Sequence, residues 1–226
     1  MSAHAPDRPQ IQPLWPTLFL SHRLPAYDRA NPVLLELITD MERARPNLTT
    51  GYLEGNLFAH SHPMLEWLEA CIRRCVLDYA GVTGIDYELD FHVQGWANIN
   101  RFGDYHNLHN HPYSWLSGTY YVQVPETRRE LPGRSDLDPG AISFFDPRAQ
   151  ANMNAIRGDA QVNPEHRVLP RPGDLLLWPA FVHHLVHPNL SDELRVSISF
   201  NIVLRWRDSY MPSGGDDQAG AGTSQA

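Results

Sequence analysis

Histidines are concentrated in two short segments of the chain, and their spacing suits a metal ion. His109 and His111 are separated by one residue, so on a strand their side chains point to the same face. A third imidazole can come from His183, His184 or His187, which follow a buried apolar strand far along the sequence. Three imidazoles on one face of an octahedral metal leave three open positions, enough for a chelating ligand and dioxygen. The pattern predicts a mononuclear metal site.

A strand near the end of the chain predicts one wall of the same site. From residue 194 onward, apolar side chains alternate with Arg195, Ser197, Ser199 and Asn201. A solvated edge strand would usually carry several long charged side chains, whereas this polar face holds one arginine and small neutral groups. We therefore expect a pocket in which Arg195 binds the far carboxylate of an oxo-acid, because its planar fork matches a carboxylate.

Further polar residues are expected on strands around this pocket. Asn98 and Asn100 share a face with Trp96, and that face is too polar for simple core. Either of the adjacent Tyr120 and Tyr121 can donate its hydroxyl to a bound carboxylate, and either can instead pack inside the sheet. Asn98 and the two tyrosines are therefore candidates for binding the cosubstrate.

Three residues are candidates for contact with a primary substrate: His106, Asn100 and Arg148. His106 has the opposite parity to His109 and His111, so we expect it near the pocket mouth. Whether His106 replaces His109 or His111 as a metal ligand stays open. Arg148 follows an Asp-Pro pair, and the alternative interpretation is a turn with an exposed arginine.

Composition narrows the classes of function. The chain has 226 residues, 42% hydrophobic content and a net charge of −8, which fits one domain and disfavours a nucleic-acid or anionic-membrane surface. All 18 basic residues are arginines, so Schiff-base chemistry and a P-loop lysine are excluded.

Residues 1–13 do not resemble a signal peptide, and no apolar run approaches the roughly 20 residues of a membrane helix. Cys71 and Cys75 form neither a metal pair nor a disulfide framework, so we expect a cytoplasmic protein.

The periodicity of the sequence changes near Tyr87. Before it, helices are expected at about 32–45, with Asn31 as N-cap and Pro32 at the first helical position, and at about 63–80. His60 and His62 belong to the cap region of the second helix. A short strand is expected at 14–20, and after Tyr87 strands are expected near 87–101, 115–125, 140–146, 166–169, 173–179, 183–188 and 194–206.

These elements predict a mainly β domain with flanking helices, a jelly roll of the cupin-like type. The domain should span 14–210, with a helical flank at about 32–80 and a β core at about 87–206. A flexible lead (1–13) and a disordered tail (211–226) should frame it. The loops 126–139 and 147–163 should shape the substrate site.

The chain resembles the 2-oxoglutarate- and Fe(II)-dependent oxygenases, and it looks closest to a bacterial branch of uncharacterised members. The segments that carry the resemblance are Leu14-Trp15-Pro16-Thr17, Trp96-x-Asn98-x-Asn100, His109-x-His111-Pro112, Ser117-Gly118-Thr119-Tyr120-Tyr121, Asp146-Pro147-Arg148, Pro172-Gly173-Asp174, His184-x-Val186-x-Pro188 and Arg195-x-Ser197-x-Ser199-x-Asn201.

This resemblance implies a double-stranded β-helix that carries Fe(II). It selects His184 as the third ligand, and it implies that Arg195 and Ser197 bind 2-oxoglutarate. One position departs from the superfamily pattern, because His111 stands where an aspartate or glutamate is usual. Three neutral imidazoles leave the site one negative charge poorer, so zinc or nickel should compete well with iron.

The expected activity is oxidation of an unidentified substrate, most often hydroxylation, with release of succinate and CO2. Two alternatives stay open: a cupin-like three-histidine dioxygenase that needs no oxo-acid, and a non-catalytic metal- or ligand-binding barrel. The expected partners are a small-molecule cosubstrate and an unknown primary substrate, without nucleic acid or membrane, and a homodimer is an open alternative for the assembly.

Overall fold

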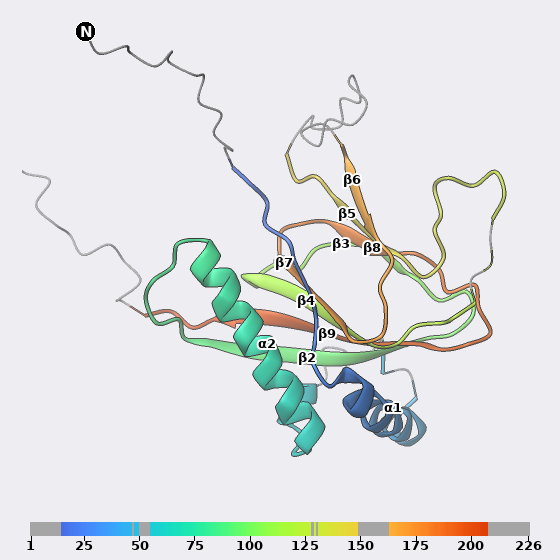
Figure 1. Ribbon diagram of the computed structural model, residues 1–226, viewed down its shortest axis with the longest axis horizontal. Coiled ribbons are helices and arrows are strands. Elements are labelled where there is room, and N and C mark those ends of the chain that lie inside the picture. The colour runs from blue at the N-terminus through green and yellow to red at the C-terminus, as the bar shows by residue number, and fades with distance from the viewer. Residues whose placement is uncertain are drawn as a thin grey trace, which may run out of the picture.

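The computed structural model describes residues 15–46, 48–49, 55–127, 129, 131–148 and 163–207. The predicted lead and tail lie outside these ranges, as does most of the loop 147–163. The described elements, in chain order (Figure 1), are β1 (Leu20–Arg23), α1 (Tyr27–Ala44), a 3-10 turn η1 (Leu57–Ala59), α2 (Pro63–Val82), β2 (Phe91–Asn100), β3 (His106–His109), β4 (Leu116–Gln123), β5 (Ile142–Phe145), β6 (Glu165–Val168), β7 (Asp174–Pro179), β8 (His184–Val186) and β9 (Arg195–Leu204).

The strands form two sheets, and every described pairing is antiparallel. The larger sheet has the order β1-β7-β4-β9-β2 and the smaller one the order β3-β8-β5-β6. This is the double-stranded β-helix with flanking helices that the sequence predicts. The predicted strands of the core agree with the structure to within a few residues at each end.

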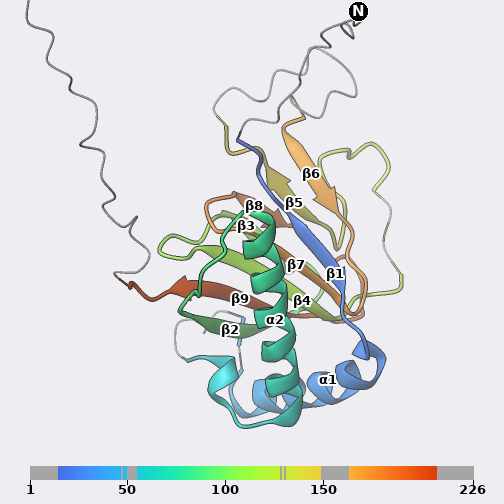
Figure 2. The same cartoon turned by 60° about the vertical axis from the view of Figure 1, so that its left-hand side comes forward.

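Both helices cover the outer face of the larger sheet, and the smaller sheet covers its inner face (Figures 1 and 2). Leu34 and Ile38 of α1 and Leu68 and Ile72 of α2 are fully buried in one core with the apolar residues of β9. A second apolar cluster, which includes Phe144 and Trp178, lies between the two sheets. Neither α1 nor α2 is long and apolar enough to span a bilayer, and no other helix of the described residues is.

The prediction for the first helix is wrong at its start. The helix begins at Tyr27, not at Pro32, so Asn31 lies within it and is not its N-cap. The Asn31 side chain is buried, and its amide donates to the Val122 carbonyl of β4 over 2.7 Å while its carbonyl accepts from the Tyr120 hydroxyl at 2.5 Å. An asparagine before a proline resembles a cap in sequence, but here it attaches the helix to the sheet.

The prediction for the first strand is also displaced. It was expected at 14–20, whereas β1 begins at Leu20 and pairs with the edge of β7 through Arg23. Ser21, His22 and Arg23 are polar and exposed, so a prediction based on an apolar run places the strand too early in the chain. By contrast, the imidazole of His62 accepts the Met64 N–H at the start of α2, as expected for a cap.

Replacing Asn31 with aspartate should destabilise the protein by about 2–3 kcal/mol, because the Val122 carbonyl loses its donor and faces a buried carboxylate. Urea unfolding measures the change. Glu36→Gln on the exposed face of the same helix should stay within about 0.5 kcal/mol of wild type. An N-cap at position 31 would accept aspartate as readily as asparagine, so an unchanged midpoint contradicts the buried role.

Candidate metal centre

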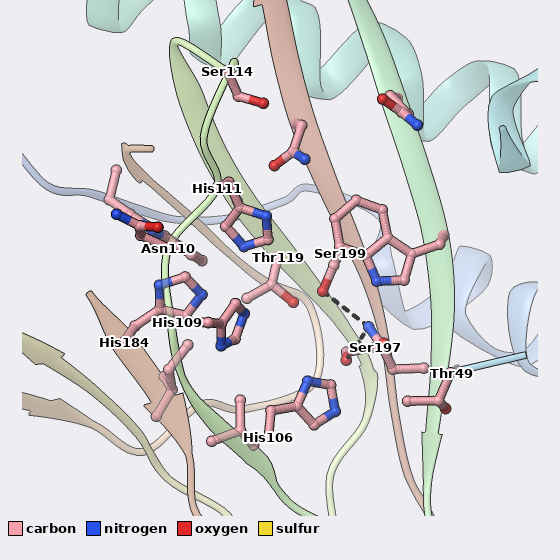
Figure 3. A pocket seen from close by; sticks show the side chains of 18 of the residues that line it. Thr49, His106, His109, Asn110, His111, Ser114, Thr119, His184, Ser197 and Ser199 are labelled. Carbon is pink, nitrogen blue, oxygen red and sulfur yellow. Dashed lines mark hydrogen bonds between the residues drawn. The ribbon is translucent and has the colours of Figure 1, made fainter. Parts of the chain in front are cut away.

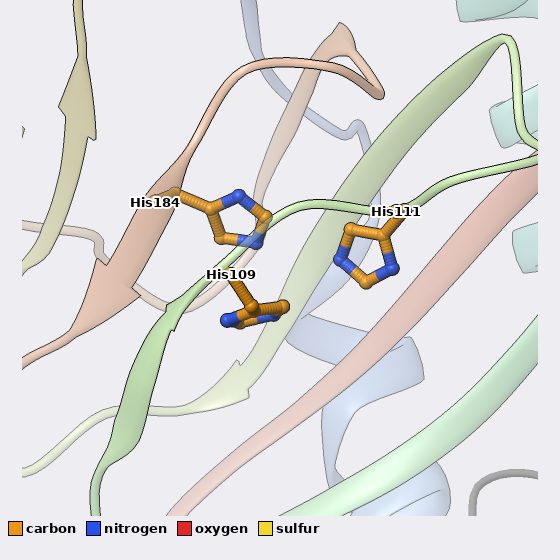
Figure 4. Close-up of side chains that lie close together, drawn as sticks. All are labelled: His109, His111 and His184. Atoms are coloured by element: carbon orange, nitrogen blue, oxygen red, sulfur yellow. The ribbon is translucent and has the colours of Figure 1, made fainter.

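Three histidines converge between the two sheets. The potential ligand atoms of His109, His111 and His184 all lie within 4.8 Å of one another (Figure 4). His109 ends β3 and His184 begins β8, and the two residues are register partners in the smaller sheet. His111 lies beyond the end of β3, so the expected strand carries only the first of the pair. Its backbone N–H donates to the Ala180 carbonyl over 3.0 Å, which fixes this loop against the end of β7.

Backbone carbonyls orient two of the three rings. The Nδ1 atom of His109 lies 2.6 Å from the Asn107 carbonyl oxygen, and that of His184 lies 3.1 Å from the Val182 carbonyl oxygen. A carbonyl only accepts, so each Nδ1 carries the proton and each Nε2 keeps its lone pair for a metal. Phe144 and Trp178 pack against the His184 ring, with centroids 5.9 and 4.9 Å away.

The environment keeps the His111 and His184 imidazoles neutral. Burial, with the neighbouring His109, lowers the pKa of His111 to about 4 and that of His184 to about 3. Both rings are therefore unprotonated at neutral pH, which is the form that binds a metal. Three imidazole nitrogen donors on oriented or packed rings fit a divalent transition metal of the Fe(II) type.

Arg195 is buried and has no carboxylate partner among the described residues. Its side chain is 2% exposed, and burial lowers the pKa of its guanidinium. One Nη donates to Asn100 over 3.2 Å, the guanidinium carbon lies 5.2 Å from the centre of the Tyr121 ring, and Nε has no hydrogen-bond partner among the described residues. The Tyr121 hydroxyl also has none, and burial raises its pKa to about 12. Unpartnered buried donors indicate an acceptor ligand such as a carboxylate.

His109, His111 and His184 face one cavity of about 830 Å³ (Figure 3). Arg195 lines the same cavity. β9 contributes the four polar residues predicted from its alternation, and β2 contributes Trp96 and Asn98. Asn98 donates to Ser199 over 2.9 Å and is near Ser197 at 3.5 Å. No aspartate or glutamate lines this cavity in the described part of the chain, so Arg195 supplies the only permanent charge there.

Two candidate residues lie away from the cavity. Tyr120 faces the helices, where its hydroxyl bonds Asn31, so of the two tyrosines only Tyr121 reaches the cavity. Adjacent residues of a strand point to opposite faces, so strand alternation groups Tyr121 with Thr119 and separates it from Tyr120. Arg148 is an exposed residue that pairs with Asp146 at 2.6 Å and lines a different, smaller hollow near Phe19. The alternative interpretation of Asp-Pro-Arg as a turn describes it better.

His106 lines the cavity, whereas Asn100 is buried beside Arg195 and is not part of the cavity wall. His106 begins β3 and lines the wall, but it is not part of the three-histidine cluster. Its Nε2 lies 3.1 Å from the Asn100 amide nitrogen, and Asn100 in turn accepts from Arg195. Both residues therefore contact the arginine network.

Sequence reasoning missed several residues of the cavity wall, among them His92, Thr119 and Trp178. His92 has the same parity as Trp96 and Asn98 on β2, and Thr119 has the same parity as Tyr121 on β4, so strand alternation is the signal that identifies both. Trp178 is 3% exposed, and its indole N–H has no partner among the described residues. Its apolar strand resembles simple core, and no pattern in the sequence separates it from its neighbours.

Comparison with known proteins agrees with this geometry. Residues 94–201 match the family described as "Putative 2OG-Fe(II) oxygenase". Over these residues the chain is similar to the 2OG-Fe(II) oxygenases. This segment contains the three histidines, Arg195, Ser197, Tyr121 and Asn98, and the donor set fits the Fe(II) and 2-oxoglutarate that the family uses. No curated protein sequence matches the chain closely enough to add to this comparison.

Solved structures agree on the fold of this chain. A prolyl-4-hydroxylase from Pseudomonas putida superposes with a TM-score of 0.54 at 15% identity, covering 84% of this chain and 89% of the other. HygX from Streptomyces hygroscopicus, crystallised with nickel and 2-oxoglutarate, gives a TM-score of 0.50 at 15% identity, covering 83% and 82%. At such identities the likeness establishes the double-stranded β-helix and no more.

Replacing His109, His111 or His184 with alanine should abolish stoichiometric metal binding, because two imidazoles hold a divalent ion far more weakly than three. Titration of the apo-protein with Fe(II) or Zn(II) under anaerobic conditions measures it. His183→Ala, at an exposed neighbouring position, should bind one metal per chain. Normal binding by His111→Ala together with its loss in His106→Ala would show that the ligand set is wrong.

His111→Asp should shift metal preference toward harder ions. A carboxylate adds a negative oxygen donor, so the ratio of Zn(II) to Mn(II) affinity should fall on the order of tenfold, about 1.4 kcal/mol. Competition titrations with a chelator of known affinity give the ratio. His111→Asn removes the imidazole without adding charge and serves as the control. A ratio that is equal in both variants would mean that charge at position 111 does not set the preference.

Proposed function

We propose that this protein is an Fe(II)/2-oxoglutarate-dependent dioxygenase that hydroxylates a small substrate and releases succinate and CO2. The observation that carries the proposal is the juxtaposition of three neutral imidazoles with a buried arginine that has no carboxylate partner in the described residues. A metal alone needs no such arginine, whereas an oxo-acid with a second carboxylate uses both the metal, which it chelates, and the arginine.

The roles follow from the lining of the cavity. Fe(II), when held by His109, His111 and His184, supplies the oxidative chemistry on dioxygen and the oxo-acid. Arg195 binds the distal carboxylate with two parallel N–H donors, and the nearby hydroxyls of Ser197 and Tyr121 assist. Such a clamp leaves the other end of the oxo-acid free to face the histidines.

Water must be limited at such a site, and the apolar cluster between the sheets serves this role. Phe144 and Trp178 pack on the His184 ring, and Val186 closes the same side. A drier cavity strengthens the interaction of Arg195 with a carboxylate. The opposite end is lined by neutral amides and hydroxyls, among them Gln94, Ser114 and Asn201, where we place the substrate.

Two other functions are less favoured. A cupin-like three-histidine dioxygenase that uses no oxo-acid gives Arg195 no task, and a non-catalytic barrel does not require the neutral, oriented imidazoles. The match of residues 94–201 to the oxygenase family supports the 2-oxoglutarate-dependent function over both.

Anaerobic titration of the apo-protein with Fe(II), and then with 2-oxoglutarate, tests the proposal. A visible charge-transfer band that requires both additions is the expected result, since it reports an oxo-acid chelating the iron. Metal binding with no such band favours the three-histidine dioxygenase or the non-catalytic barrel. Absence of metal binding rejects the proposed function itself.

Arg195→Leu should leave metal binding intact and weaken 2-oxoglutarate by ~2–5 kcal/mol, the usual loss when one member of a buried charged pair is removed. Ser197→Ala should cost less, because it removes one neutral donor. Calorimetry with redox-inert Mn(II) in the site measures both affinities. Arg29→Leu, on the exposed surface of α1, is the matched control. Unchanged 2-oxoglutarate affinity in Arg195→Leu contradicts the assigned role.

A further inference from the structure

A chain of two hydrogen bonds leads away from Arg195 on the side of β3. Arg195 donates from Nη1 to the Asn100 side-chain oxygen over 3.2 Å. The Asn100 amide nitrogen lies 3.1 Å from Nε2 of His106. Asn100 is 2% exposed and stands opposite Arg195 in the β2–β9 ladder, so the ladder itself sets this pair. The hydrogen-bond path from His106 to Arg195 therefore runs through Asn100.

The direction of the Asn100 amide depends on His106. An asparagine side chain can present either its oxygen or its NH2 group to a neighbour, and the two have almost the same shape. Only the oxygen can accept from the Arg195 guanidinium, so the NH2 group must face His106. That requires Nε2 of His106 to be an acceptor, with the ring proton on Nδ1. Burial, followed by the nearby Arg195, lowers the pKa of His106 to about 4, which keeps the ring neutral.

The turn between β2 and β3 places His106 next to Asn100. Gly103 has a φ of 86°, which favours glycine, and its N–H donates to the Asn189 carbonyl over 2.7 Å. The Arg101 N–H donates to the Asp104 carboxylate over 2.7 Å. The Asn189 side chain donates to the Asn100 carbonyl over 3.0 Å. The His106 position is thus fixed by the backbone and not by chance packing.

A neutral partner matters because of the charge. A carboxylate next to Arg195 would hold the guanidinium in place, but it would also neutralise the charge that an anionic ligand needs. The Asn100 oxygen holds one Nη without a formal charge, and the Nε edge remains without a partner among the described residues.

We propose that Asn100 and His106 are positioning residues for Arg195: the His106 lone pair fixes the Asn100 amide, and the Asn100 oxygen aims the guanidinium while leaving its charge available to 2-oxoglutarate. This rests on the proposed function for the identity of the ligand. His106 and Asn100 then serve the cosubstrate rather than the primary substrate.

Three variants test the proposal by calorimetry with 2-oxoglutarate and Mn(II)-loaded protein. His106→Leu should weaken 2-oxoglutarate about three- to tenfold, the loss expected for one neutral hydrogen bond, with metal stoichiometry unchanged. His106→Gln should restore most of the affinity, because its side-chain oxygen can accept from Asn100. Asn100→Asp should weaken binding more than His106→Leu does, because a carboxylate would pair with Arg195 and repel the dianion. His22→Leu, at an exposed position of β1, is the control.

Equal affinity in His106→Leu and wild type overturns the proposal, and so does an Asn100→Asp variant that binds as tightly as wild type. Loss of metal from His106→Leu also overturns it, because His106 would then be a ligand. Failure of His106→Gln to restore affinity would assign the loss to packing alone.

A second measurement does not depend on 2-oxoglutarate. Nitrogen-15 NMR of the imidazoles in the metal-free protein should show His106 as the neutral tautomer with its proton on Nδ1, and Asn100→Leu should remove this preference. A proton on Nε2 in the wild type contradicts the inference directly. If the wild type shows the predicted tautomer but does not bind 2-oxoglutarate with metal, the proposed function fails while the hydrogen-bond chain stands.

Discussion

The register of the β2–β9 ladder is the constraint on which the site depends. Both strands have ten residues, and on β9 Val196, Ile198 and Phe200 are buried in the helix-side core while the alternate polar residues line the cavity. Each buried apolar side chain contributes about 1.5–3 kcal/mol, so the apolar face selects the register. A slip by one residue would place Arg195 in the helix-side core and its apolar neighbours in the cavity, at a prohibitive cost. Burial of the apolar face of β9 therefore fixes the position of Arg195 and the other polar residues on the opposite face.

Charge is the second constraint, and it favours an anionic cosubstrate. The described lining holds one guanidinium, the three clustered imidazoles and no carboxylate. With a divalent metal the site would be strongly positive, and a dianion that reaches both the metal and Arg195 would neutralise most of that charge. A 2-His-1-carboxylate site carries one negative charge of its own, so the His111 site attracts anions more strongly. The same lack of charge weakens its preference for iron over softer ions.

Much of this arrangement could be predicted from the sequence, for definable reasons. Strand alternation identifies the cavity face of β9 and the polar face of β2, because the period of two is fixed by backbone geometry. The predictions that were wrong or left open concern features that depend on tertiary contacts. Asn31 has the sequence context of a cap, yet its amide bonds Val122 on a distant strand. Strand alternation separates Tyr120 from Tyr121, but the position of the helices decides which face of β4 lines the cavity. The position of His111 outside β3 follows from where the strand ends, which periodicity does not show.

The placement of the three ligands has a mechanical consequence. His109 and His184 are paired across the smaller sheet, so the ladder sets their separation before any metal binds. His111 belongs to the connection between β3 and β4, which is fastened to β7 through the Ala180 carbonyl. Tyr113 in this connection has a φ of 68° and is 98% exposed, and it lines the cavity together with Ser114. A metal held by all three histidines therefore joins the smaller sheet to the segment that borders the substrate end. In this geometry the ion both supplies the chemistry and fixes one edge of the cavity in which the substrate must bind.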